Sequence, residues 1–196
     1  MSASSAMSTK GSVRERLLAA ADELFYRDGV HSVGVDRVID TAGVAKASLY
    51  RTFGTKEHLV AAYLAARHQK MFDYLLRAVD KKREPRDRLL AIFDAQAQWI
   101  NRRQYRGCPF ARASAEPSVG ALVLSETASY RDDIRTLLTT LGSEAGAADA
   151  AALGLQLSLL YHGVTGISER GQLRVATAAL RSAAETLIDA ATNGGR

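Results

Sequence analysis

Cysteine and proline are scarce in this sequence. The 196 residues include one cysteine, Cys108, and three prolines. A single cysteine excludes an intramolecular disulfide and a metal site built from several cysteines. No apolar run approaches the roughly 20 residues that a helix needs to cross a bilayer. Residues 1–11 are small and polar and lack the apolar stretch of a signal peptide. We therefore expect a flexible tail there, and a cytoplasmic protein that binds no membrane.

Motifs for catalysis and for cofactor binding are also missing. The sequence has no glycine-rich phosphate loop, no zinc-type His/Glu pairing and no nucleophile elbow. We expect no catalytic residues, no bound metal and no cofactor, so this is not expected to be an enzyme. Cys108 follows Arg106 closely and leaves two interpretations open: a redox-sensing thiolate stabilised by that arginine, or an idle buried thiol.

The pattern that is present is helical throughout. No segment of useful length alternates polar and apolar residues as a half-buried strand does, and the prolines fall near predicted helix boundaries. We therefore expect an all-α protein, with a break at 107–110 and a linker at 142–146. The predicted helices cover residues 12–28, 35–42, 45–53, 56–80, 86–104, 117–141, 147–168 and 172–191.

Two short predicted helices, 35–42 and 45–53, are separated by Gly43, which tolerates the backbone dihedrals of a tight turn. Helix, turn, helix is an arrangement found in many DNA-binding proteins. Residues 44–56 include three basic and no acidic side chains, so this segment can approach phosphates without repulsion. The second helix is predicted to expose residue types that reach base edges and phosphates in a major groove, namely Lys46, Ala47, Ser48, Tyr50 and Arg51.

This region closely resembles the DNA-binding domain of TetR-family repressors, over about residues 12–60. The resemblance rests on Ala42-Gly43-Val44, Leu49-Tyr50, Phe53 and Lys56-Glu57 at the family's spacing. It implies a three-helix DNA-binding domain at 12–55 and a larger helical domain for ligand binding and dimerisation at 56–196. It also implies a homodimer, a palindromic operator of double-stranded DNA, and release of that DNA when a small-molecule effector binds.

The resemblance also assigns roles to single residues. By position, Tyr50 and Lys56 match residues that usually contact phosphate, whereas Ile39 and Thr52 depart from the family pattern. Ile39 stands where a small alanine is usual, and Thr52 stands where histidine is common, so one phosphate contact is expected to be weaker. The variable base-reading positions are matched by Lys46, Ala47, Ser48 and Arg51.

The last two predicted helices carry narrow apolar seams with heptad-like spacing, which favours helix pairs that cross at about 20°. The family resemblance implies that two such helices from each subunit form a four-helix dimer interface, although packing inside one subunit is the alternative. Leu155 and Leu159 lie off the seam and are expected to pack internally. The seam residues are Leu153, Leu157, Leu160, Val164, Leu173, Ala176, Leu180, Ala183 and Leu187.

A ligand pocket is expected between the long middle helices. Gln96 is a polar residue on an otherwise apolar face, and a buried amide needs a partner that a ligand could supply. A satisfied core residue is the alternative for Gln96, as it is for the aromatic candidates. The predicted lining comprises Tyr63, Phe93, Gln96, Trp99, Phe110, Tyr130 and His162.

Together these observations predict a ligand-responsive, DNA-binding transcriptional regulator, most simply a repressor. The alternative is a helical interaction protein, or a small-molecule-binding protein, that does not read DNA sequence. The acid-free segment 44–56 favours the first interpretation.

Overall fold

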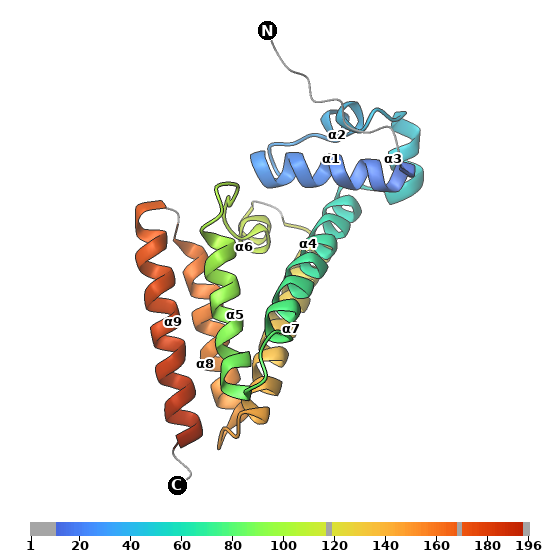
Figure 1. Ribbon diagram of the computed structural model, residues 1–196. Coiled ribbons are helices and arrows are strands. Elements are labelled where there is room, and N and C mark those ends of the chain that lie inside the picture. Colours follow the sequence, from blue (N-terminus) through green and yellow to red (C-terminus); the bar gives the residue numbers. More distant parts are fainter. Residues whose placement is uncertain (1–10, 117–118, 168–169, 194–196) are drawn as a thin grey trace. The chain divides into compact units, whose positions relative to one another are not determined.

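The computed structural model describes residues 11–116, 119–167 and 170–193, and these residues contain helices and no strand (Figure 1). This confirms the all-α prediction. The predicted tail, 1–11, lies outside the described residues apart from Gly11. The elements are α1 (Val13–Asp28), α2 (Val35–Ala42), α3 (Lys46–Phe53), α4 (Lys56–Val79), α5 (Pro85–Ile100), α6 (Pro109–Ser114), α7 (Ala121–Glu144), α8 (Ala150–Gly163), the short 3-10 helix η1 (Val164–Gly166) and α9 (Arg170–Asn193).

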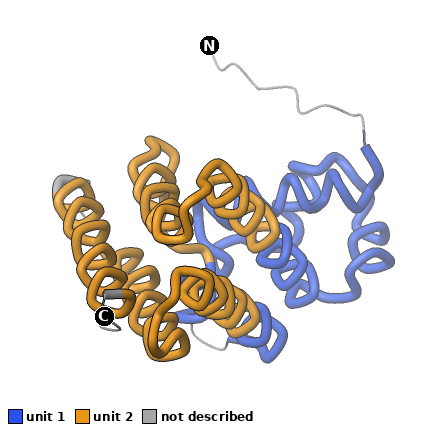
Figure 2. The backbone as a smooth tube through the Cα atoms, turned by 60° about the horizontal axis from the view of Figure 1, so that its bottom comes forward, with its two compact units in different colours: residues 1–66, 110–126 blue, residues 67–109, 127–196 orange. Residues whose placement is uncertain are grey.

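The chain divides into two compact units, which Figure 2 distinguishes by colour. The first contains residues up to 66 together with 110–126, and the second contains 67–109 and the residues from 127 onward. The predicted boundary between the DNA-binding and ligand-binding domains, at residues 55 and 56, stays a prediction. Two hydrogen bonds join residues of 110–126 to earlier helices within the first unit. Arg112 Nη1 donates to the carbonyl of Tyr26 at 2.8 Å, and the Leu122 amide donates to Glu57 Oε1 at 2.9 Å.

The first unit is built on α1, which packs against α2 and α3. A capping box begins this helix, because the Ser12 amide donates to Glu15 Oε2 at 2.7 Å and the Glu15 amide donates to Ser12 Oγ at 3.2 Å. The hydrogen bond from the Ser12 backbone lowers the pKa of the Glu15 carboxyl. The apolar face of α1 is buried, with Leu17 and Leu24 in the core. Local sequence signals therefore define this helix well.

The second unit is a helical body in which α9 packs against α5 and α8. Several predicted boundaries shift here. α5 ends at Ile100, and α6 starts inside the predicted break at 107–110. α7 continues to Glu144 and shortens the predicted linker, while α8 starts at Ala150 because the carboxylate of Asp149 caps it by accepting from the Ala152 amide at 2.9 Å. Pro117, the first residue of the predicted helix 117–141, lies outside the described residues.

The predicted dimer seam is largely internal. Leu153, Leu157, Val164, Leu173 and Leu180 are buried within their own chain and cannot also line a surface for a partner. The other seam residues, Leu160, Ala176, Ala183 and Leu187, are half-buried. The prediction that Leu155 and Leu159 pack internally is wrong as well, because these side chains are 49% and 66% exposed. The face of α8 that was predicted to meet a partner is thus buried in its own chain, and the face that was predicted to pack internally is exposed.

Candidate functional site

The turn between α2 and α3 is held by a residue from α1. Gly43 adopts a left-handed conformation, with φ 61° and ψ 44°, which glycine accepts at little cost. The guanidinium of Arg16 donates to the Ala42 carbonyl from Nε at 3.0 Å and from Nη2 at 2.6 Å, and it also donates to the Gly43 carbonyl. These bonds satisfy carbonyls at the C-terminus of α2 and fix where α3 begins. Sequence analysis did not single out Arg16.

The helix α3 presents one face to solvent and buries the other. Leu49 and Phe53 are buried, whereas the predicted residues Lys46, Ala47 and Arg51 are exposed. Tyr50 is also exposed, at 45%, which is unusual for a tyrosine with only a packing role. The structure therefore places these four predicted DNA contacts on the accessible face of one short helix.

Ser48 and Thr52 are half-buried and less accessible than their neighbours on α3. The hydroxyl of Thr52 donates to the Ser48 carbonyl at 2.7 Å, so its proton is already used within the helix. The hydroxyl oxygen of Thr52 can still accept a hydrogen bond, but it offers no free donor to a phosphate. The weaker phosphate contact expected at this position stays a prediction.

Lys46 has an acidic neighbour from α2. Its ammonium lies 2.8 Å from Asp36 Oδ1, and this hydrogen bond raises the pKa of Lys46. Both side chains are mostly exposed, so the pair can exchange readily for another partner. Arg51, in contrast, forms no ion pair with any residue in the described ranges. The exposed face of α3 thus carries the guanidinium of Arg51, which is unpaired within the described ranges, and the ammonium of Lys46, whose ion pair with Asp36 can exchange for another partner.

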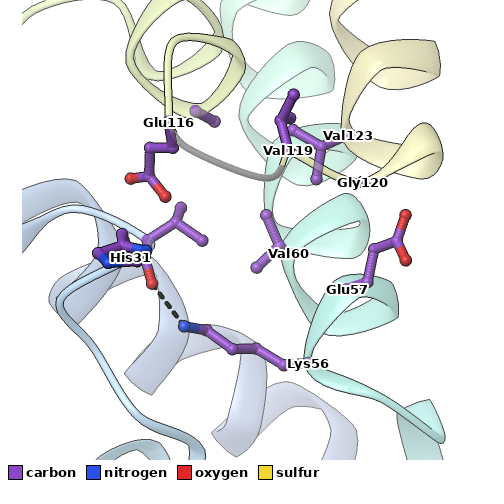
Figure 3. A pocket seen from close by; sticks show the side chains of 10 residues that line it. His31, Lys56, Glu57, Val60, Glu116, Val119, Gly120 and Val123 are labelled. Carbon is purple, nitrogen blue, oxygen red and sulfur yellow. Dashed lines mark hydrogen bonds between the residues drawn. The ribbon is translucent and has the colours of Figure 1, made fainter.

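Lys56 forms a hydrogen bond within the first unit, and its predicted phosphate contact stays a prediction. Its ammonium donates to the Val30 carbonyl at 2.7 Å and faces a pocket of about 180 Å³ within the first unit (Figure 3). Burial lowers the pKa of Lys56, and the nearby carboxylate of Glu116 opposes that shift. The amine therefore ties the loop before α2 to the start of α4. A direct phosphate contact would require it to leave Val30.

Four polar side chains meet inside the second unit. Gln96 Nε2 donates to the Tyr161 carbonyl at 2.5 Å, and the hydroxyls of Tyr161 and Tyr130 lie 3.2 Å apart. The ring of Tyr130 also meets His162 edge to face at 5.7 Å. Gln96, Tyr130 and His162 were predicted pocket residues and are brought together. We call Gln96, Tyr130, Tyr161 and His162 the buried polar cluster.

The buried polar cluster is uncharged at neutral pH. Burial raises the pKa of the Tyr130 and Tyr161 phenols, which therefore stay protonated. Burial, assisted by the charge of Arg131, lowers the pKa of His162 to about 4, which keeps its imidazole neutral. Gln96 Oε1 and His162 Nε2 are buried and have no hydrogen-bond partner among the described residues. Such unpaired polar atoms are costly and mark places where a ligand could bind.

The other predicted pocket residues lie elsewhere. Phe93 is part of the core of the second unit, and Trp99 instead packs against Tyr74, with ring centroids 5.2 Å apart. Tyr63 and Phe110 are buried in the first unit, where Tyr63 meets Phe25 edge to face. Sequence analysis missed Tyr161, although its spacing of four residues from the buried Leu157 indicates the same inward face of α8.

The described part of the chain contains no group of three or more His, Cys, Asp or Glu placed to hold a metal ion. Among the helices of that same part, none combines the length and the hydropathy needed to cross a membrane. Cys108 is buried.

A helix-turn-helix with an exposed basic recognition helix, followed by a larger helical body, defines a class of DNA-binding regulators. The model of the family described as "Bacterial regulatory proteins, tetR family" matches residues 17–63. A crystal structure of a TetR-family transcriptional regulator from Streptomyces coelicolor superposes with a TM-score of 0.83 and 26% identity, covering 92% of this chain and 96% of that one.

Curated regulators give the same result. The transcriptional activator FasR of Mycolicibacterium smegmatis is 32% identical over 145 residues, covering 72% of this chain and 66% of FasR. The transcriptional repressor NemR of Escherichia coli is 32% identical over 113 residues, or 55% of each chain. The matched regions thus span about two thirds or less of these relatives. The chain belongs to the TetR family of transcriptional regulators, which confirms the resemblance and the expectation that it is not an enzyme.

Proposed function

We propose that this protein binds a palindromic DNA operator as a homodimer, represses transcription there, and releases the DNA when a small molecule enters its second unit. The single observation that carries the DNA-binding part is the face of α3, where Lys46, Ala47, Tyr50 and Arg51 are exposed together. FasR is named an activator and NemR a repressor, so both modes occur among the relatives. Operator binding would place the protein in the cytoplasm, with the chromosome.

Within that face, some side chains would contact base edges and read the sequence, and others would contact phosphates and position the helix. Lys46 and Arg51 can donate to guanine, and Ala47 and Ser48 are small enough to let the helix approach base edges. Tyr50 would donate its hydroxyl to a phosphate. Lys56 would contribute mainly by holding the Val30 loop against α4, because its ammonium is already engaged there.

The effector site would be the buried polar cluster. Gln96 Oε1 needs a hydrogen-bond donor, and the surrounding phenols and imidazole are neutral, so an uncharged ligand fits better than an ion. We propose an aromatic or apolar molecule of modest size that carries a hydroxyl or amide donor. Coupling of about 1–3 kcal/mol between this site and DNA binding would be enough for a switch.

The dimer surface would be the exposed side of α8 and α9, occupied by a second copy of the chain. Leu155 and Leu159 on α8 and Val175 on α9 are exposed, and Val175 is 72% exposed. Exposed large apolar side chains that lie together are typical of an interface. We define the α8–α9 surface by its exposed, uncharged residues, which are Ala151, Ala152, Leu155, Leu159, Gly163, Val175, Ala179 and Ser182.

The test of the DNA-binding proposal is selection of bound fragments from the source genome. We expect the recovered fragments to share a palindrome whose half-sites lie about one helical turn, or a multiple of it, apart. Binding that falls steeply with salt but enriches no common sequence would favour the alternative, a protein that does not read DNA.

The effector proposal is tested with a panel of aromatic alcohols and the matching hydrocarbons. Operator release is measured for the natural protein and for Gln96→Leu, with Gln104→Leu as an exposed control. We expect some alcohols to release DNA where their hydrocarbons do not, and Gln96→Leu to abolish the difference. Equal release of both variants by the same alcohols would exclude Gln96 as the ligand's partner.

A further inference from the structure

A groove of about 310 Å³ lies between α4 and α5 in the second unit, lined by residues that the buried polar cluster does not use. Its lining follows helical spacing on both sides. Tyr74, Arg77, Ala78 and Lys81 come from α4 and the turn after it, whereas α5 contributes residues 91, 94, 95 and 98. The volume is at the lower end of the range for small-molecule sites.

Small side chains form the floor of the groove. Ala91 and Ala95 are both 3% exposed, and Ala78 lies opposite them on α4. Larger residues at these positions would fill the space between two packed helices. The alanines therefore leave a narrow apolar surface that a flat ring or an aliphatic chain can cover.

The rim of the groove is positively charged. Arg77, Lys81 and Lys82 line it, and none of them forms an ion pair within the described ranges of the chain. The only acidic residue in the lining is Asp94, and its carboxylate is already paired with Arg181 Nε at 2.9 Å. The lining of the groove thus contains three cations and one carboxylate, and that carboxylate is paired with Arg181, which does not line the groove. Such a rim attracts anions.

One end of the groove is aromatic. The hydroxyl of Tyr74 donates to Gln98 Oε1 at 3.3 Å, and both residues line the groove. The ring of Trp99 packs against Tyr74, and the Arg102 guanidinium lies 4.3 Å from the centroid of the Trp99 ring. A fourth cation is therefore held beside this end of the groove, over a rigid aromatic surface.

We infer that this groove is a second small-molecule site, distinct from the buried polar cluster, and that it binds an organic anion. The apolar body of the ligand covers Ala78, Ala91 and Ala95, and its carboxylate, sulfonate or phosphate meets Arg77 and Lys81. This ligand class differs from the neutral effector proposed above. The two sites can therefore be tested independently.

The experiment uses the fluorescent anion anilinonaphthalenesulfonate and its uncharged analogue phenylnaphthylamine, which has the same rings without the sulfonate. Trp99 is the only tryptophan in the chain, so energy transfer from it reports binding beside the groove. Dissociation constants of both probes are measured at low salt for the full-length protein, for Arg77→Gln/Lys81→Gln, for Ala78→Leu, and for Lys70→Gln as an exposed control on α4.

We expect the sulfonate to tighten binding about tenfold in the natural protein and in Lys70→Gln. Arg77→Gln/Lys81→Gln should remove that advantage while phenylnaphthylamine binding is unchanged, and Ala78→Leu should weaken both probes. Circular dichroism checks that each variant is folded. The inference is overturned if the sulfonate gives no advantage, or if the double variant and Ala78→Leu bind both probes as the natural protein does, which would place the probes elsewhere.

Discussion

The carboxylate of Asp36 lies beside the ammonium of Lys46, at the edge of the face proposed to meet DNA. The Asp36 carboxylate pairs with an ammonium that is proposed to bind the operator, and its negative charge repels DNA phosphates. We expect Asp36→Asn to raise affinity for operator and scrambled DNA alike, by about two- to tenfold at low salt. Fluorescence anisotropy with both duplexes measures this effect.

The control for Asp36 is Glu23→Gln, which makes the same charge change on α1. We expect no more than a small increase there, because Glu23 pairs with Arg27 on the same helix. Equal gains from the two variants would show that only net charge matters. An unchanged affinity in Asp36→Asn would mean that this pair does not restrain Lys46.

His162 gives the protein a defined pH dependence. Its pKa is lowered from 6.5 to about 4 by burial, so the folded protein holds it neutral in a range where the unfolded chain takes up a proton. Between these values the unfolded state binds more protons, and the free energy of unfolding therefore falls as the pH falls. We expect this residue alone to account for a loss of roughly 1–3 kcal/mol between pH 6.5 and pH 4.

Urea unfolding at several pH values measures that loss. In His162→Gln, which cannot titrate, the decline across this window should be smaller by the same amount. His31→Gln, an exposed control, should retain the full decline. If His162→Gln declines as steeply as the natural protein, His162 is not held neutral by the fold.

At the scale of elements, the turn between α2 and α3 depends on Arg16. We expect Arg16→Ala to lower the free energy of unfolding by about 1–3 kcal/mol, because charge-assisted hydrogen bonds to the Ala42 and Gly43 carbonyls are lost. Operator affinity should fall with it, since α3 loses its fixed starting point. Urea unfolding and operator titration provide the two measurements.

Arg27→Ala is the matched control on the same helix. Its guanidinium is itself exposed and pairs only with Glu23 and the adjacent Asp28 near the surface, so its loss should cost less than about 0.5 kcal/mol. Arg16 would have no special role in the turn if its variant unfolded at the same urea concentration as Arg27→Ala and bound the operator equally well.

The elements that could be predicted are those with local signals. The capping box of Ser12 and Glu15, and the glycines at 29, 43 and 54, define α1, α2 and α3 within a residue or two. The helical repeat of apolar residues in α3 also predicted which of its side chains are exposed. Arg16 could not be predicted, because 26 residues separate it from the carbonyl it binds and no local pattern encodes that distance.

The α8 helix shows why the remainder was missed. Residues 150–163 contain no Asp, Glu, Lys or Arg, and apolar side chains occur on every face. Heptad spacing identifies an apolar seam in such a helix, but it does not indicate which face packs within the subunit and which face stays exposed. The choice is made by packing against α9, so Leu157 is buried and Leu159 is exposed. The same ambiguity about which face of α8 is buried explains why Tyr161 was missing from the predicted pocket residues.

At the scale of the whole molecule, the α8–α9 surface predicts a dimer. We expect Leu159→Asp and Val175→Asp to shift the protein to monomers, because each places an unpaired charge in an apolar interface at a cost of about 2 kcal/mol or more. Light scattering over a range of protein concentrations measures the mass. Circular dichroism should remain unchanged, since both side chains are exposed.

Leu124→Asp is the control, because Leu124 is 47% exposed on α7 and outside this surface. It should leave the oligomeric state unchanged. Dimers that persist in both Leu159→Asp and Val175→Asp would exclude the α8–α9 surface. The dimer would then be formed by another surface of the chain.

The central claim, that α3 reads DNA sequence, is tested most directly by titrating Lys46→Ala and Arg51→Ala against the selected operator and a scrambled duplex. If these side chains donate to guanine, each variant should lose about 1–3 kcal/mol of operator binding while binding to scrambled DNA changes much less. The ratio of the two affinities should therefore fall by roughly tenfold or more. An unchanged ratio in both variants would contradict the account, because α3 would then hold DNA without reading it.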